Sequence, residues 1–144
     1  MNASTPTHPL EDYLGYQLRR ATAAMQADLN ARIGALGVTI VEMSTLLVIE
    51  NNPLITQSEI GRMLSIKSAN MAPLTGGLFN RGLIERAPID GRSHGLRLSQ
   101  AGETLVGKLH QAVDENEALI MARMSEAERV IARKLLRSIW TGRD

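Results

Sequence analysis

Side chains that could catalyse a reaction are few and far apart in this sequence. There is no cysteine, which excludes thiol chemistry and thiolate metal sites. The three histidines, His8, His94 and His110, are widely separated, and no Ser-His-Asp order, glycine-rich phosphate loop or HExxH motif is present. Glu115 and Glu117 do not share a helical face. We therefore expect no catalytic residue, no metal site, no cofactor and no enzyme activity.

The charged residues are more informative, because they are unevenly distributed along the chain. From Thr56 to Arg97 there are six basic and three acidic residues, and six minus three gives +3. From Glu103 to Glu128 there are two basic and six acidic residues, and two minus six gives −4. A basic middle beside an acidic flank is typical of a protein that presents one face to a polyanion. A random distribution of surface charge explains the same counts equally well.

The basic middle opens with two short predicted helices. Thr56 and Glu59 have the spacing of a capping box, and Ile60 begins the buried face of the first helix. A short connection leads to the stretch "SANMAPLTGG" at 68–77, which continues through Arg81. Two short helices joined by a tight turn form a helix-turn-helix pattern.

After this stretch, apolar and polar residues alternate with a period of two, in place of the helical spacing of the apolar residues. In "GLIERAPIDGRSHGLRLS" the alternation of "LRL" indicates a strand, and "DG" marks a hairpin loop. The turn is built on Pro88, Asp90 and Gly91. This pattern predicts a small two-stranded ribbon whose loop carries Arg92 and His94.

Helices are expected on both sides of this central part. Residues 1–9 are polar and expected to fray, and an apolar stripe from Leu10 predicts a helix that ends near the glycines at 34–37. The residues expected to cap the other helices are Thr39, Ser99 and Ser125. One small domain cannot cover the apolar stripes of the terminal helices, so we expect these helices to pack together across a dimer. The alternative is a monomer with an intramolecular helix pair.

The order of elements and the residues around the hairpin resemble the MarR family of winged-helix transcription regulators. The matching residues are Gly82, Leu83, Ile84, Glu85 and Arg86 before the loop, Asp90 and Arg92 within it, and Leu98, Ser99 and Gly102 after it, with Ser in place of the usual Thr. The resemblance implies a mainly α fold with a small β-hairpin wing. The implied domains are a flexible N-terminus at 1–9, a dimerisation helix at 10–35, a winged helix-turn-helix DNA-binding lobe at 38–98 and C-terminal dimerisation helices at 99–144.

The resemblance also implies a function, that of a homodimeric repressor of transcription bound to double-stranded operator DNA. The wing arginine would enter the minor groove and the fourth helix the major groove, and a ligand bound where the dimer helices meet the lobe would release the DNA. No signal peptide or membrane-spanning run is apparent, so we expect a cytoplasmic protein without a membrane partner. The alternative function is that of a helical interaction or scaffold protein whose hairpin is only structural.

Within the wing, we expect Asp90 to hold Arg92 and the loop backbone in a fixed shape. A guanidinium suits the narrow, negative minor groove of A·T-rich DNA. The alternative is a turn-stabilising pair at the surface. The other residues expected to face DNA are Thr56, Gln57, Lys67, Ser68, Asn70, Thr75 and His94.

The stretch at 68–77 departs from the family pattern. Pro73 stands where many relatives have an arginine, so one arginine that contacts DNA is missing. Proline is tolerated in the first turn of a helix. We therefore predict a late or distorted start, with Asn70 near the cap and Lys67 and Ser68 on the approach. The alternative is a regular helix that begins at Ser68.

A ligand site is expected from the residue types of the first helix. Tyrosines and arginines near a dimer junction suit a small aromatic carboxylate or its thioester. The polar candidates are Tyr13, Tyr16, Gln17 and Arg20, and the apolar lining candidates are Met43, Leu47 and Met71. The alternative is that the tyrosines pack in the dimer interface while the arginines form surface ion pairs.

Overall fold

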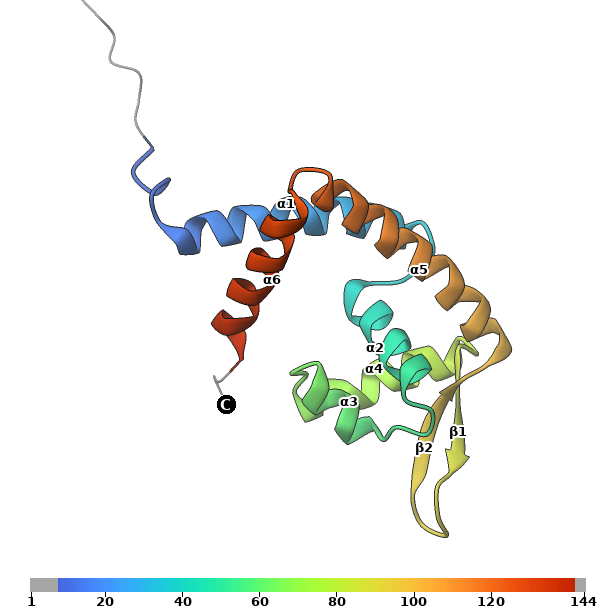
Figure 1. Cartoon of the computed structure of the whole chain (residues 1–144). Helices are drawn as coiled ribbons and strands as arrows, with labels where there is room; N and C mark the ends of the chain where they lie inside the picture. Colours follow the sequence, from blue (N-terminus) through green and yellow to red (C-terminus); the bar gives the residue numbers. More distant parts are fainter. Residues whose placement is uncertain (1–7, 142–144) are drawn as a thin grey trace, which may run out of the picture.

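The structure is a computed structural model that describes residues 8–141. Within these residues, helices flank an antiparallel hairpin (Figure 1). The elements are α1 (Leu14–Gly34), α2 (Ile40–Asn51), α3 (Gln57–Met63), α4 (Ser68–Asn80), β1 (Ile84–Pro88), β2 (His94–Leu98), α5 (Gln100–Met121) and α6 (Glu126–Trp140). The mainly α architecture with a small hairpin confirms the predicted fold class. Residues 1–7 and 142–144, which belong to the predicted N-terminal and C-terminal segments, lie outside the described residues.

Side-chain caps set the start of four helices. The hydroxyls of Thr39, Thr56 and Ser125 each accept a backbone N–H three residues on, and a glutamate at that position closes a capping box. Ser99 caps α5 by accepting the N–H of Gly102 at 3.0 Å. These caps confirm the predicted starts, because each satisfies a backbone donor that the first helical turn leaves unpaired.

The first helix begins at Leu14, four residues later than the apolar stripe predicts. Residues 9–12 form turns, and Tyr13 is extended, with φ −84° and ψ 119°. The extended residue interrupts the helical path between Leu10 and Leu14. The predicted end is confirmed, since α1 stops at Gly34 and Gly37 takes a positive φ of 77°.

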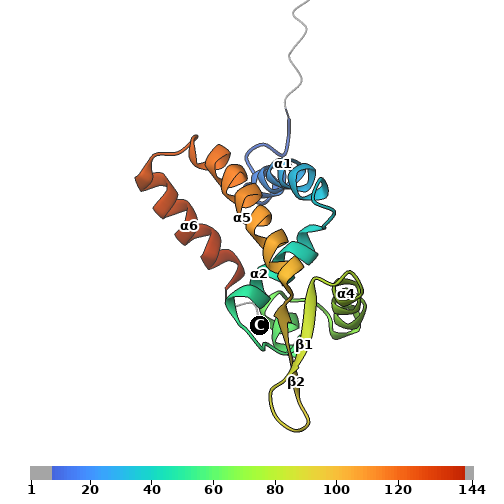
Figure 2. The ribbon, with the colours of Figure 1, turned by 90° about the vertical axis from the view of Figure 1, so that its right-hand side faces the viewer.

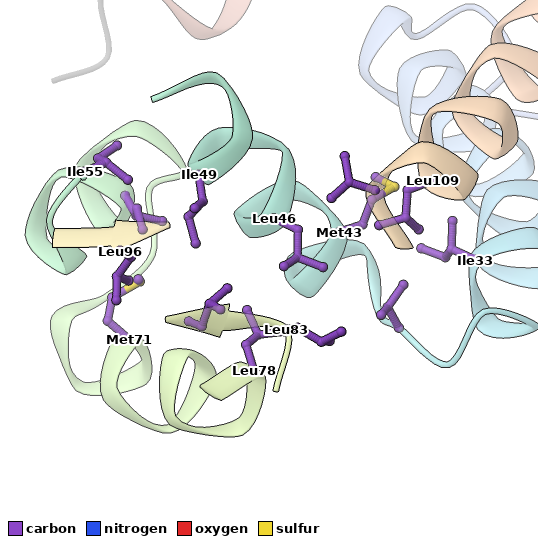
Figure 3. Packing of buried hydrophobic residues seen from close by; sticks show 14 of the residues in the cluster. Ile33, Met43, Leu46, Ile49, Ile55, Met71, Leu78, Leu83, Leu96 and Leu109 are labelled. Atoms are coloured by element: carbon purple, nitrogen blue, oxygen red, sulfur yellow. The ribbon is translucent and has the colours of Figure 1, made fainter. Parts of the chain in front are cut away.

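The core lies between α2 and the elements around it (Figure 3). Leu46 and Ile49 of α2 are buried, and they point toward Leu78 of α4 and Leu83, which directly precedes the hairpin. At the other end of α2, Met43 lies beside Ile33 of α1 and Leu109 of α5, as Figure 3 shows. One continuous core therefore joins the central lobe to the two long helices.

The hairpin is anchored to the lobe along β2, and its tip projects from the lobe (Figure 2). Strands β1 and β2 pair from Ile84 with Leu98 to Pro88 with His94. Pro88 is thus the last residue of β1, where the sequence places it in the turn. Midway along β2, Leu96 pairs with Ile55, and the neighbouring Gly95 lies so close to the Leu54 carbonyl that a Cβ there would collide with it. The far end projects from the lobe in both views (Figure 2).

The long helices extend away from the tip of the hairpin. Helices α1 and α5 pack side by side, and α6 turns back from the end of α5 without joining the core (Figures 1 and 2). No residue of α6 is buried in the described chain. Its large apolar side chains, which include Ile131, Leu135 and Ile139, are 40–67% exposed. The fold leaves an apolar helix face with no partner within the described chain.

Candidate nucleic-acid interface

Asp90 fixes the shape of the wing loop. Its carboxylate accepts the backbone N–H of Arg92 at 2.9 Å and that of Ser93 at 2.8 Å, and also the Ser93 hydroxyl at 3.3 Å. These hydrogen bonds, the one from the Arg92 backbone first, lower the pKa of Asp90 below its ordinary value. The carboxylate thus holds the loop backbone, as the sequence predicts, and acts on Arg92 through its N–H.

Two arginines of the wing, Arg92 and Arg97, differ in whether they form an ion pair. Arg97 on β2 pairs with Glu85 on β1, with 2.9 Å between Nη2 and Oε2. No ion pair involves Arg92 within the described chain, and both Arg92 and His94 are exposed. Arg92 therefore presents its guanidinium beyond the hairpin, while Arg97 ties the two strands together.

The start of α3 is held by its cap. The Thr56 hydroxyl accepts the N–H of Glu59, and the Glu59 carboxylate accepts both the hydroxyl and the N–H of Thr56, at 2.7 and 2.8 Å. These bonds, with the Thr56 hydroxyl first, lower the pKa of Glu59. The prediction that Thr56 caps this helix is confirmed. Thr56 is half-buried and lies at the edge of the candidate interface.

Helix α4 begins at Ser68, so the prediction of a late start near Asn70 is wrong. Lys67 occupies the cap position without a side-chain cap bond, and Pro73 lies inside a continuous helix. Proline lacks the N–H that would bond to the carbonyl of Ala69. Both Ala69 and Pro73 are exposed, so water can solvate this carbonyl and the helix tolerates the proline.

Thr75 faces the core, so the expectation that it contacts DNA is wrong for this conformation. The residue is only 3% exposed. Its hydroxyl oxygen lies 3.0 Å from the Gln57 side-chain carbonyl and 3.0 Å from the Met71 carbonyl, and these two acceptors share its one proton. Thr75 therefore positions α4 against the start of α3. The 18-residue separation from Gln57 leaves no local signal by which the sequence could reveal this bond.

The remaining polar candidates gather where α3 meets the start of α4. A hollow of about 450 Å³ opens between these helices. Its lining includes Gln57, Arg62, Lys67 and Ser68. Asn70 is exposed two residues after Ser68 on α4. The structure thus brings Gln57, Arg62, Lys67 and Ser68 together around one hollow, and Asn70 lies outside its lining.

Arg81 makes a connection within the fold that the sequence does not single out. Directly after α4, its guanidinium donates to the Gly37 carbonyl at 2.8 Å and to the Glu42 carboxylate at 3.2 Å. Glu42 also closes the capping box of α2. Arg81 thus connects the end of α4 with the link between α1 and the lobe. Nothing in the local pattern distinguishes it from a solvated basic residue.

The expected ligand residues fall into separate groups. On α1, the Tyr16 hydroxyl accepts a bond from Arg20 at 3.3 Å and bonds to His8 Nε2 at 2.9 Å, while the Arg19 guanidinium lies 5.3 Å from the Tyr16 ring centre. Gln17 donates from its side chain to a backbone carbonyl, and Tyr13 is 64% exposed.

The apolar candidates do not line a shared cavity with this group. Met43 and Met71 are core residues at opposite ends of the buried cluster (Figure 3), and Leu47 is half-buried. Within a single chain, Met43 on α2 and Met71 on α4 are therefore too far apart to line one cavity (Figure 3), and which of the three residues lines a ligand site stays a prediction.

Other kinds of site are not indicated in the part of the chain that the structure describes. Residues 8–141 hold no group of three or more His, Asp or Glu side chains suited to a metal ion. In the same range, no helix combines the length and apolar character needed to cross a bilayer.

The helix-turn-helix and its fixed wing define a winged-helix DNA-binding protein. The MarR family model matches residues 38–94. A Thauera aromatica protein assigned as the transcriptional regulator of the hcr operon is 30% identical over 130 residues, with 88% of this chain and 78% of that protein covered. The chain therefore belongs to the MarR family of transcription regulators.

Solved structures and a further sequence relative agree with this assignment. The transcriptional repressor CouR bound to a 23-mer DNA duplex is similar with a TM-score of 0.84 and 27% identity, over 95% of this chain and 99% of that one. CouR bound to p-coumaroyl-CoA is similar with a TM-score of 0.83 and 26% identity, over 95% and 98% of the two chains. An HTH-type transcriptional repressor of Mycobacterium tuberculosis is 24% identical over 128 residues, covering 88% of this chain and 92% of that protein.

Proposed function

We propose that this protein represses transcription by binding operator DNA as a homodimer and that a small aromatic acid or its thioester releases it. The observation that carries the proposal is the wing, in which Asp90 fixes the loop and Arg92 stays free of ion pairs among the described residues. A scaffold protein has no need for a fixed, exposed guanidinium at the tip of a hairpin. Membership in a family of transcription regulators also favours this role over the scaffold alternative.

Arg92 is assigned to the minor groove of the operator, and α4 to the adjacent major groove. The residues of α4 and its approach assigned to DNA are Lys67, Ser68 and Asn70. We assign Thr56, Gln57 and His94 to phosphates at the borders of this surface, since phosphate contacts orient a protein on the duplex. Gln57 uses its side-chain oxygen for Thr75, which leaves its amide N–H groups to donate.

The dimer is supported by the apolar face of α6. Six of its apolar side chains, at positions 130, 131, 135, 136, 139 and 140, are exposed in the single chain. On α1, Leu14 and Met25 are also exposed. An exposed apolar stripe of this length marks a protein interface. A two-fold axis would place two wings and two α4 helices on one side of the assembly, at the spacing of successive major grooves.

The effector is assigned to an aromatic carboxylate or its thioester. CouR, which shares 26% identity with this chain, has been solved with p-coumaroyl-CoA, the thioester of an aromatic acid. On α1, Arg19, Arg20 and Tyr16 form a cationic and aromatic group that suits such a ligand. Because this group is exposed in one chain, the partner protomer is expected to supply the apolar wall of the site.

Isothermal titration of the dimer with benzoate, 4-hydroxycinnamate and 4-hydroxycinnamoyl-CoA tests the effector. We expect one of them to bind, to weaken the complex with operator DNA, and to lose affinity in Arg20→Gln. Arg133→Gln on α6 is the matched control, since it removes the same charge elsewhere. Absence of heat from all three compounds, together with unchanged DNA binding, would contradict this part of the proposal.

A gel shift with the DNA upstream of the protein's own gene tests the repressor function directly. We expect a shifted band that excess unlabelled duplex of the same sequence removes more effectively than a scrambled duplex. The absence of any band at low salt would contradict DNA binding.

A further inference from the structure

The outer face of α4 is built from small apolar side chains. Met71 and Leu78 point into the core and are at most 2% exposed. On the opposite side of the helix, Ala69, Ala72 and Pro73 are all exposed. The side of a recognition helix that faces away from the core is the side that enters the major groove. The surface that α4 offers to base edges is thus largely apolar.

No charged side chain is available along α4 itself. The helix sequence from Ser68 to Asn80 contains no basic or acidic residue. The basic residues that border α4 are Lys67 at the cap, Arg81 directly after the helix, Arg62 across the hollow from α3, and Arg86, whose guanidinium lies 5.6 Å from the centre of the Phe79 ring. Bidentate contact from arginine or lysine to guanine is the commonest specific contact in the major groove. The body of α4 cannot make it.

The feature of the major groove that an apolar side chain can read is the 5-methyl group of thymine. We propose that α4 reads thymine methyl groups through Ala69, Ala72 and Pro73, so that the base pairs beneath the centre of α4 are A·T pairs. This inference rests on the proposed DNA-binding function and adds the chemistry by which the helix selects its site. Asn70, at the border of the same face, suits the adenine of a neighbouring pair.

The backbone of α4 permits the close approach that methyl contacts require. No atom of the chain outside its own helix neighbourhood lies within 4 Å of a Cβ placed on Gly76. Gly76 follows Ala72 and Pro73 on the outer face, one turn further along. Short side chains and a bare backbone let the helix lie deep enough for a Cβ to contact a methyl group.

Replacement of thymine by deoxyuridine is the direct test, because it removes the methyl group and keeps the Watson–Crick pair and the minor-groove edge. The full-length protein first selects its preferred duplex from a random pool, and each thymine of that duplex is then replaced singly. We expect two symmetric groups of positions at which the Kd rises about fourfold for each methyl group lost. Replacements at minor-groove positions beneath the wing should leave the Kd unchanged.

A variant of the protein assigns the effect to α4. In Ala72→Gly, with its folding checked by circular dichroism, the difference between thymine and deoxyuridine should disappear at one position of each half-site. A Kd that is unchanged by deoxyuridine at every thymine, or a selected site with G·C pairs beneath α4, would overturn the inference while leaving DNA binding intact. Failure to enrich any sequence would overturn the proposed function as well.

Discussion

At the scale of single residues, Asp90 and Arg92 have different roles in presenting the wing to DNA. The Asp90 carboxylate orders the loop by accepting two backbone N–H groups, and Arg92 carries the exposed charge. The residue types and their order let the sequence predict this pair. The sequence could not predict that Thr75 is buried, because a threonine in a short helix suits either face and only the packing of α3 against α4 decides between them.

Removal of the Arg92 guanidinium should weaken DNA binding. For Arg92→Ala we expect the Kd to rise about tenfold and the slope of log K against log salt to fall by about one, since one phosphate or groove contact is lost. Arg97→Ala is the matched control on the same hairpin, because Glu85 already pairs with that guanidinium. Fluorescence anisotropy at several salt concentrations gives both quantities, and equal losses in the two variants would count against a special role for Arg92.

Removal of the Asp90 carboxylate distinguishes the effect of loop order on DNA affinity from the effect of net charge. Asp90→Ala makes the wing more basic, so attraction to DNA alone predicts tighter binding, whereas loss of the loop's hydrogen bonds predicts weaker binding. We expect weaker binding, by several-fold. A tighter complex, measured in the same anisotropy assay, would show that Asp90 does not prepare the wing.

The acidity of Asp90 provides a pH test of the same bonds. Because the folded-state pKa is lowered, the stability that this carboxylate contributes is present above its unfolded pKa and is lost as the pH falls through the folded pKa. The loop should therefore remain ordered at pH 5 and loosen only in more acidic solution. NMR titration of the Asp90 carboxyl carbon measures this directly, and a midpoint above the ordinary aspartate value would contradict it.

At the scale of elements, capping residues made the starts of four helices predictable, and α1 and α4, which have no side-chain cap, were the exceptions. Thr39, Thr56, Ser99 and Ser125 each mark a helix start in the sequence and in the structure. For α4 the signals conflict, since Ser68 and Asn70 are both plausible caps and Pro73 favours the later one. Burial of Met71 and Leu78 against the lobe decides the outcome, and tertiary packing overrides the local preference of the proline.

Substitution of Pro73 should stabilise the lobe. Pro73→Ala restores a backbone hydrogen bond to the Ala69 carbonyl, and we expect the free energy of unfolding to rise by about 1–3 kcal/mol. Gly76→Ala, for which the structure leaves open space, should add about 1 kcal/mol and serves as a comparison for helix propensity alone. Urea denaturation measures both, and a loss of stability in Pro73→Ala would be inconsistent with a helix that begins at Ser68.

At the scale of the whole molecule, a compact DNA-facing lobe is joined to helices whose apolar faces are uncovered. The core continues from the lobe through Met43 to α1 and α5, so a change in the dimer helices can reach the lobe through packed side chains. Arg81 adds a polar connection between the end of α4 and the link to α1. The sequence predicted the two uncovered stripes, but the position of α6 away from the core follows only from the assembled fold.

Charge on the apolar face of α6 should dissociate the dimer. Leu135→Glu places a carboxylate in the proposed interface, and we expect a monomer by light scattering and a large loss of operator affinity. Arg133→Gln changes the net charge equally and lies on the opposite side of α6, so it should remain dimeric. A Leu135→Glu protein that stays dimeric would place the interface elsewhere.

The most direct test of the central claim is the affinity for a selected duplex and for its scrambled counterpart, measured by anisotropy between 50 and 200 mM salt. The DNA-binding account predicts that the selected duplex binds about 10³-fold or more tightly than the scrambled one, and that both affinities fall steeply with salt. Equal affinities for the two duplexes, or binding that does not respond to salt, would contradict it.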